Sequence, residues 1–272
     1  MVVKYTNYDN LDIDLELFRI QNYKNAELVL EPSNKACLFI LGMLFANGAN
    51  IKILNEKDLS FEDTNKSFTM MPYVWSKLCD DNFPAIDYSN VKTEMDKRIE
   101  NIKRIGVKTH KIENKPVINK HFLICPVRIA TAEQRKWIED YVSMMMEKGY
   151  TIHAPHLHTV QTDLFGGYGI CMQNAEAIGS SECVDILYNQ KSTGSVFDLG
   201  VAYAFHKPLN LLNKEDIVFD DNDLIDSIVK KWSLKTEKDK NFHKEFREMI
   251  QRHVGTLYVD NDGIVKKRTL NN

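Results

Sequence analysis

The sequence predicts an α/β fold: a flavodoxin-like or Rossmann-like parallel sheet with helices on both faces, plus a degenerate N-terminal partial repeat. Between residues 121 and 213, short apolar runs alternate with single helical segments, which is the pattern of parallel βαβ units. In addition, residues 36–63 align without a gap on residues 194–221. A match of this length within one chain indicates an internal repeat.

The first strand and helix of the central unit have the clearest signals. Residues 121–127 ("HFLICPV") form a short apolar run, which is typical of a buried parallel strand. Thr131 is placed to cap a helix over residues 132–148, and Gly149 is placed to end it. The apolar residues that recur at helical spacing, and that we expect on the buried face, are Trp137, Tyr141, Met144 and Met145.

Three more strands follow in the same unit. Residues 150–155 ("YTIHAP") predict the second strand, and residues 183–189 ("CVDILYN") predict the third. A loop over residues 156–167 and a helix containing Asn174 connect them. After a turn rich in small residues, a helix begins near Gly194, and the fourth strand, "LNLLN", follows Pro208.

The N-terminal repeat lies 158 positions before its counterpart, as from Gly42 to Gly200. The match includes glycine and polar positions, for example Asn55 with Asn213, which favours duplication over a chance similarity of composition. The acid of the second copy is missing from the first, because Ile40 stands at the position that corresponds to Asp198. We therefore expect the first copy to serve packing alone.

These patterns divide the chain into four parts. Residues 1–78 form the partial repeat, and residues 79–118 form a helical linker with an amphipathic helix over residues 89–106. Residues 119–217 form the main α/β domain. The C-terminal extension, residues 218–272, predicts two charged helices (221–232 and 239–253) and a short strand (255–260) followed by a turn at 261–263.

Composition restricts the classes of partner. A formal charge of −3 and a pI near 6.3 give no general reason to bind nucleic acid or an anionic membrane. The five cysteines include no CxxC pair, so neither a disulfide framework nor a thiolate zinc site is expected. The N-terminus lacks the pattern of a signal peptide, and no run approaches the ~20 apolar residues of a membrane span. We expect a cytoplasmic protein that acts on a small molecule without a cofactor.

The carboxyl ends of parallel strands are where α/β proteins bind ligands, which selects the loop before the predicted helix at Gly194. Ser192, Gly194 and Ser195 can present backbone N–H groups to a phosphate or to sugar hydroxyls, although the same residues also suit an ordinary helix cap. Asp198, one turn further on, is either a solvated acid favoured by the helix dipole or a group that faces a ligand. The apolar Ile40 at the equivalent position favours the ligand, because packing does not require a carboxylate there.

Other polar residues near the strand ends are less specific. Arg128, which follows Pro126, is placed to meet an anion or simply to face solvent. Cys125 is expected to be a small buried residue and not a nucleophile, because no catalytic triad pattern accompanies it. The histidines of "HAPHLH" lack an obvious fourth ligand, so we expect loop residues near substrate and no metal site; they are His153, His156 and His158.

Four segments together resemble the nucleoside 2-deoxyribosyltransferase-like family, in an N-glycosidase branch with a GSxFDLG motif. The similarity covers about residues 119–217. The segments are "HFLICPVR" (121–128), "TVQTD" (159–163), "ICMQNAEAI" (170–178) and "STGSVFDLGVAYAFHKP" (192–208). The resemblance implies a flavodoxin-like domain that cleaves the N-glycosidic bond of nucleosides or their 5′-monophosphates.

The resemblance also implies roles for particular residues. Asp198 falls where the family has a nucleophilic Glu, and Asn174 falls where many members have an Asp that contacts sugar or base. Asp is one methylene shorter than Glu, and Asn cannot transfer a proton. Asp163 would then supply the acid for the leaving base, and Gln161 would contact the base edge. Pro126, Arg128, Ser192, Gly194 and Ser195 would bind the rest of the substrate.

Family active sites often take one residue from a neighbouring subunit of a dimer. The chain is therefore expected either to form a homodimer or to use its N-terminal repeat as an intrachain partner, with residues 69–75 ("TMMPYVW") lining the pocket. The predicted function is hydrolysis of a nucleoside or nucleotide, or less favourably deoxyribosyl transfer, with Asp198 at the anomeric carbon. The alternative is a nucleotide-binding sensor that has lost turnover.

Overall fold

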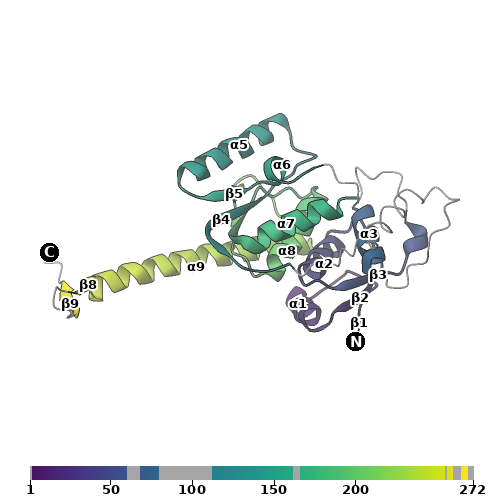
Figure 1. Ribbon diagram of the computed structural model, residues 1–272, viewed down its shortest axis with the longest axis horizontal. Coiled ribbons are helices and arrows are strands. Elements are labelled where there is room, and N and C mark those ends of the chain that lie inside the picture. The colour runs from purple at the N-terminus through teal and green to yellow at the C-terminus, as the bar shows by residue number, and fades with distance from the viewer. Residues whose placement is uncertain are drawn as a thin grey trace.

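The computed structural model describes residues 2–59, 68–79, 112–161, 166–254, 256–259 and 265–268, and it confirms the α/β class. Two parallel sheets are flanked by helices (Figure 1). One has three strands in the order β1-β2-β3, and the other has four in the order β5-β4-β6-β7. The bounds are β1 Val2–Tyr5, β2 Asn25–Leu28, β3 Asn50–Ile53, β4 Val117–Ile124, β5 Thr151–His153, β6 Ser181–Ile186 and β7 Leu209–Leu211.

The helices connect successive strands, as the alternating pattern predicts. Helix α8 begins at Thr193, and the extended backbone of Ser192 (φ −87°, ψ 99°) marks the N-cap. Helix α5 begins with a capping box in which Thr131 and Gln134 exchange hydrogen bonds. The helix bounds are α1 Ile13–Asn22, α2 Lys35–Ala46, α3 Met70–Cys79, α5 Ala132–Glu147, α6 Pro155–His158, α7 Tyr168–Ser180, α8 Thr193–Ala204 and α9 Leu224–Val254, with a short 3₁₀ helix at Glu56–Asp58.

The layers place helices between the two sheets. In Figure 1 the β1-β2-β3 sheet is followed by α1 and α2, then by α7 and α8, then by the second sheet, with α5 on its far face. The outer face of the first sheet is polar, because Glu27 lies between Lys4 and Lys52 at 3.0 and 3.6 Å. The residues of the inward face are buried and those of the outer face are mostly polar, with the exposed Val2 as an exception, which is the pattern of a sheet solvated on one side.

The two copies of the repeat share equivalent hydrogen bonds at their strand ends. The Asn55 side chain accepts from the backbone N–H of Leu30 (2.8 Å) and donates to its carbonyl (3.1 Å). The Asn213 side chain does the same with Tyr188 (2.9 and 3.0 Å), and both residues lie 158 positions later. The two helices also end alike, with positive φ at Gly48 and at the corresponding His206. The two copies therefore share their strand-helix-strand geometry.

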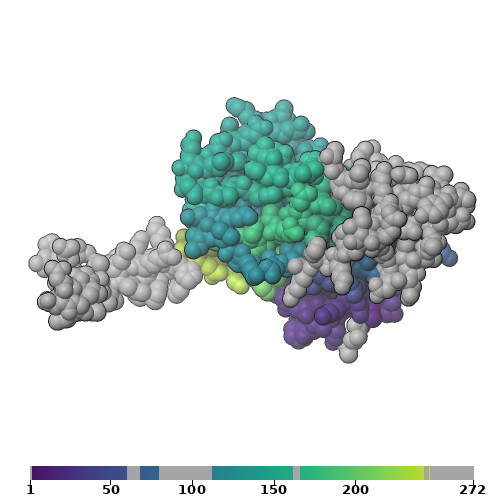
Figure 2. Space-filling model, in the orientation of Figure 1, coloured from purple at the N-terminus to yellow at the C-terminus, as the bar shows by residue number. Residues whose placement is uncertain are grey.

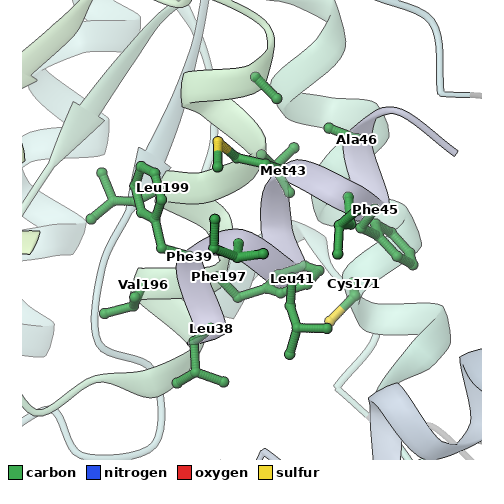
Figure 3. Packing of buried hydrophobic residues seen from close by; sticks show 14 of the residues in the cluster. Leu38, Phe39, Leu41, Met43, Phe45, Ala46, Cys171, Val196, Phe197 and Leu199 are labelled. Carbon is green, nitrogen blue, oxygen red and sulfur yellow. The ribbon is translucent and has the colours of Figure 1, made fainter. Parts of the chain in front are cut away.

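Helices α2 and α8 pack directly against each other at their two equivalent glycines. A Cβ added at Gly42 would lie 2.1 Å from the carbonyl oxygen of Phe197, and one added at Gly200 would lie 2.1 Å from that of Phe39. Figure 3 shows the side chains of both helices gathered at this contact. Phe39 and Phe197 are equivalent positions of the repeat, as are Gly42 and Gly200. Each glycine therefore contacts the phenylalanine of the other copy, which is the reciprocal form of a twofold interface.

The main apolar core extends through both halves of the chain. It contains residues of the first sheet, of α2, of α8 and of the inner face of the second sheet. A smaller core lies between α5 and the other face of the second sheet. Figure 2 shows the N-terminal repeat, in purple, lying directly against the teal and green central domain. The two halves are therefore joined by a continuous hydrophobic interior.

Several sequence-based expectations need correction. The buried face of α5 consists of Ile138, Val142 and Met145, whereas Trp137 is 40% exposed and Met144 is 38% exposed. The expected pair of C-terminal helices is one helix, α9, because the connecting residues 233–238 contain neither Gly nor Pro to interrupt it. The expected loop after residue 155 contains the short helix α6.

The C-terminal end contains an additional strand. Strand β8, Thr256–Val259, pairs antiparallel with β9, Val265–Arg268, which the sequence did not predict. The turn expected at 261–263 and the amphipathic helix expected over 89–106 lie outside the described residues. In the described part of the chain, no helix combines the length and apolar character needed to cross a membrane.

Candidate functional site

Helix α8 carries Asp198 into a nearly closed environment. The helix lies between the second sheet and α2, so that every residue from Ser195 to Ala202 is buried, and Asp198 itself is only 7% exposed. Its Oδ2 atom accepts a hydrogen bond of 3.1 Å from Nδ2 of Asn174 on the neighbouring helix α7. The two principal residues of the sequence prediction are therefore in direct contact.

Burial dominates the electrostatics of this carboxyl group. It raises the pKa of Asp198 to about 7, and the hydrogen bond from Asn174 only partly opposes the rise. Among the described residues, no Lys or Arg lies within ion-pair distance of the carboxylate. An ionised Asp198 is thus a buried negative charge to which the described part of the chain provides one neutral donor.

Asn174 is held by a second hydrogen bond on its other side. Its Oδ1 atom accepts from the hydroxyl of Thr159 at 2.8 Å, and Oγ1 of Thr159 lies 2.9 Å from Nε2 of His153. Thr159 and Asn174 are both buried. Burial and neighbouring positive charges lower the pKa of His153 to about 4, so its ring is neutral at pH 7.

The sequence did not point to Thr159 as a functional residue, and it gave His153 no particular partner. The three residues lie at the end of β5, just after α6 and in the middle of α7, so no local spacing connects them. Thr159 and His153 share only the signal that each is polar and lies near a predicted strand end or helix start. That signal is too common to single out these two residues, whereas Asn174 was found through the family resemblance.

The end of β4 lies close to the carboxylate. Burial and, to a smaller extent, the charge of Asp198 raise the pKa of Cys125 to about 12. The thiol is therefore neutral and 6% exposed, as expected for a packing residue. Pro126 is also buried, whereas Arg128, two residues further, has an exposed side chain at the rim of the strand end.

The start of α8 is open toward solvent. Ser192 makes no side-chain cap hydrogen bond to the helix; its hydroxyl oxygen instead accepts from the Ser195 hydroxyl at 2.8 Å. Gly194 is exposed, and a Cβ added there would meet nothing within 4 Å. The N–H groups of the first turn of a helix have no intrahelical acceptor, so this end can donate to a bound oxygen group.

The remaining predicted residues lie in the loop after α6. The side-chain amide of Gln161 donates to the carbonyls of Pro155 and Thr159, at 2.8 and 3.1 Å. These hydrogen bonds stabilise the conformation of its own loop. Asp163 lies outside the described residues. The segment 69–75 belongs mostly to α3, which packs against α7 and β3.

A cavity of about 620 Å³ lies at the same edge of the sheet. The segment after β6 forms part of its wall through four residues before the start of α8: Leu187, Tyr188, Asn189 and Gln190. It is lined by two acids and no Lys or Arg, and Asp198 is not among its lining residues. The other lining groups come from the first turns of α5 and from the loop after β7: Glu133, Gln134, Trp137, Leu212, Asn213, Asp216, Ile217 and Val218.

The buried cluster of His121, Cys183 and Asp185 has the residue types of a metal site, with ligand atoms within 4.8 Å of one another. These groups already satisfy each other. Nδ1 of His121 lies 2.7 Å from Asp185, and Nδ2 of Asn210 donates to Asp185 (2.6 Å) and to Cys183 (3.0 Å). Lys240 in turn donates to Asn210, which places a positive charge beside the cluster. The arrangement is that of a satisfied polar network under α5.

No protein-family model matches this chain, and neither the curated proteins nor the solved structures contain a significant match. A buried carboxylate with a pKa near neutrality, one amide donor and an open helix start can stabilise a developing positive charge next to hydroxyl or phosphate oxygens.

Proposed function

We propose that this protein cleaves the N-glycosidic bond of a nucleoside or a nucleoside 5′-monophosphate, with Asp198 acting at the anomeric carbon. The observation that carries the proposal is the Asp198 carboxyl group, which is 7% exposed and, among the described residues, has a single hydrogen-bond donor and no cation beside it. A cationic sugar is the partner that such a charge lacks.

The reaction follows from that charge. As the bond between C1′ and the base nitrogen breaks, the electron pair leaves with the base and positive charge develops on C1′ and the ring oxygen. The ionised Asp198 stabilises this charge more strongly than water would, because the site is dry. Water then adds to C1′, its proton is released, and the base takes up a proton to become neutral.

The other residues are assigned by position and by the family resemblance. The open start of α8, with Ser192, Gly194 and Ser195, would bind a 5′-phosphate or sugar hydroxyls through its N–H groups. Arg128 at the end of β4 would add a positive charge to a phosphate. Asp163 and Gln161 would act near the base, and Asn174 orients Asp198.

The direct test is to incubate the protein with nucleosides, nucleoside 5′-monophosphates and NAD-like dinucleotides and to follow free base by chromatography. Base release that is lost in D198A and D198N is the expected result. The control is D239N, which removes one carboxylate in the same way at an exposed position of α9, far along the chain from Asp198. Absence of release from every substrate by folded wild-type protein contradicts the proposal.

A binding protein without turnover is the second candidate, because Asn174 cannot transfer a proton at a position where the resemblance has an acid. Calorimetry with the same compounds separates the two functions. Turnover that requires Asp198 supports the enzyme. Binding without base release, in wild type and in D198A alike, supports the sensor.

A further inference from the structure

Four polar side chains form a continuous hydrogen-bonded chain that ends at Asp198. Thr159 donates its hydroxyl proton to Oδ1 of Asn174 (2.8 Å), and Nδ2 of Asn174 donates to Asp198 (3.1 Å). His153 lies at the far end, 2.9 Å from Oγ1 of Thr159. These contacts join β5, the residue after α6, α7 and α8.

The chain has a fixed direction. A hydroxyl group carries one proton, and that of Thr159 is given to Asn174, so the contact with His153 requires the ring to donate from Nε2. With the reverse amide orientation, Oδ1 of Asn174 would face the ionised carboxylate and repel it. The ionised carboxylate therefore selects the orientation in which Asn174 donates to Asp198, and Thr159 stabilises that orientation by donating its hydroxyl proton to Oδ1 of Asn174.

We propose that Thr159 and His153 are positioning residues that, through the amide of Asn174, hold Asp198 in its ionised form. This role rests on the proposed function and deepens it, because it explains how the carboxylate that acts at the sugar is kept ionised. Neither residue needs to touch the substrate. Each acts on the reaction only through the orientation of Asn174.

The charged surroundings are consistent with this assignment. The Cys125 thiol beside Asp198 is neutral, so Asn174 is the residue whose hydrogen bond favours the ionised carboxylate. His153 faces His158 and Lys120, both of which oppose its protonation, and its ring stacks on Phe122. A neutral ring with a proton on Nε2 is therefore the form expected near pH 7.

The first test needs no variant and no substrate. Nitrogen-15 NMR of histidine-labelled protein at pH 7 reports the tautomer of each ring, and H153F identifies the signal of His153. A neutral His153 with its proton on Nε2 is the expected result. A proton on Nδ1, or a charged ring, overturns the direction of the chain.

The second test measures the titration of Asp198 itself by carbon-13 NMR of its carboxyl group, identified by its loss in D198N. In T159V the midpoint should rise by about 0.5 to 1 pH unit, since one neutral hydrogen bond is lost. T159S, which keeps the hydroxyl, should restore the wild-type midpoint. T151V makes the same exchange at an exposed position of β5 and should leave it unchanged. An unchanged midpoint in T159V overturns the proposal.

The pH dependence of base release adds a readout from the reaction. In T159V, kcat/KM at pH values below the Asp198 midpoint should fall about 3- to 10-fold, with little loss at pH 9, where the carboxylate is ionised in both proteins. If no substrate releases base while T159V still shifts the carboxyl titration, the proposed function fails and the positioning role stands. If base is released but the titration does not move, the positioning role fails alone.

Discussion

Asp198 changes the pH dependence of folding stability in the opposite direction to a typical ion-paired carboxylate. Its pKa is raised from 3.8 to about 7 in the folded protein, so the folded state keeps the proton longer than the unfolded state does. Stability from this residue is fully present below about pH 4 and is lost as pH rises toward 7. The equivalent Ile40 has no such effect, which shows that the fold accepts an uncharged residue in this position.

D198N should therefore stabilise the protein at neutral and alkaline pH. The gain in free energy of unfolding should be close to zero at pH 4 and reach about 4 kcal/mol at pH 8, because Asn removes the cost of ionising a buried acid. Urea unfolding of both proteins at several pH values measures the difference. A gain that does not change with pH would show that Asp198 is not buried in this way.

His156 is a second polar residue whose burial opposes folding. Both of its ring nitrogens are buried and find no hydrogen-bond partner within the described residues, and burial lowers its pKa. H156L should raise the free energy of unfolding by about 1 kcal/mol at pH 8, because it removes unsatisfied groups. The gain should grow below pH 6.5, where the unfolded wild type takes up a proton that the folded state excludes.

His158 provides the matched control on the same short helix. Its Nδ1 atom accepts a hydrogen bond of 3.0 Å from the backbone N–H of the buried Ala154. H158L should lower the free energy of unfolding by about 1 kcal/mol, because that N–H then has no partner. Equal effects of H156L and H158L in denaturant unfolding would contradict the contrast between the two histidines.

At the scale of elements, the contact between α2 and α8 depends on the absence of side chains at two positions. In G200A the new Cβ would lie 2.1 Å from a backbone carbonyl of α2, so the two helices would have to move apart. We expect a loss of about 3 kcal/mol in thermal or urea unfolding.

G194A in the first turn of the same helix is the control. Its Cβ would meet nothing within 4 Å, so the change should be neutral or stabilising by up to about 1 kcal/mol. A G200A variant as stable as G194A would show that the helices are not in backbone contact. The two substitutions have the same chemistry and differ only in the space around them.

The sequence predicted most of the central elements because their apolar runs are short and are separated by caps and glycines. It placed Met145 of α5 correctly in the core but also expected Trp137 and Met144 there. It missed Ile138, because the pair Trp137 and Met144 and the pair Ile138 and Met145 form neighbouring stripes of equal spacing. Periodicity cannot choose between such stripes. Only the position of the second sheet decides which one is covered.

The candidate site was predictable only in part, because some of its residues are brought together by contacts between elements that leave no pattern in the sequence. Asp198 could be found because the repeat provides an internal comparison with Ile40. Thr159 could not be found, since its role depends on contacts with Asn174 and His153 that come from three different elements. Such contacts follow from the fold as a whole and have no local sequence signal.

At the scale of the whole molecule, the chain has the layout of a twofold dimer made from one polypeptide. The two copies meet through α2 and α8, and their equivalent glycines exchange contacts as the subunits of a symmetric dimer do. The symmetry is broken at the site, since the carboxylate of α8 corresponds to Ile40 of α2. The first copy thus provides a packing surface for α8.

Because one core extends through both halves, the two copies should unfold together. Far-UV circular dichroism and tryptophan fluorescence should give one coincident urea transition, as neither half can unfold without exposing apolar side chains of the other. Trp75 reports on the N-terminal repeat, where it is 2% exposed, and Trp232 on α9 reports on the C-terminal side. Two separated midpoints would contradict a shared core.

The most direct test of the account is base release from a nucleoside or nucleoside 5′-monophosphate by the wild type and by D198N at pH 8. D198N keeps the shape of the side chain and is expected to be the more stable protein, so any loss of turnover cannot come from unfolding. We expect release by the wild type and a loss of at least about 100-fold in D198N. Equal release by both proteins would contradict a role for the carboxylate.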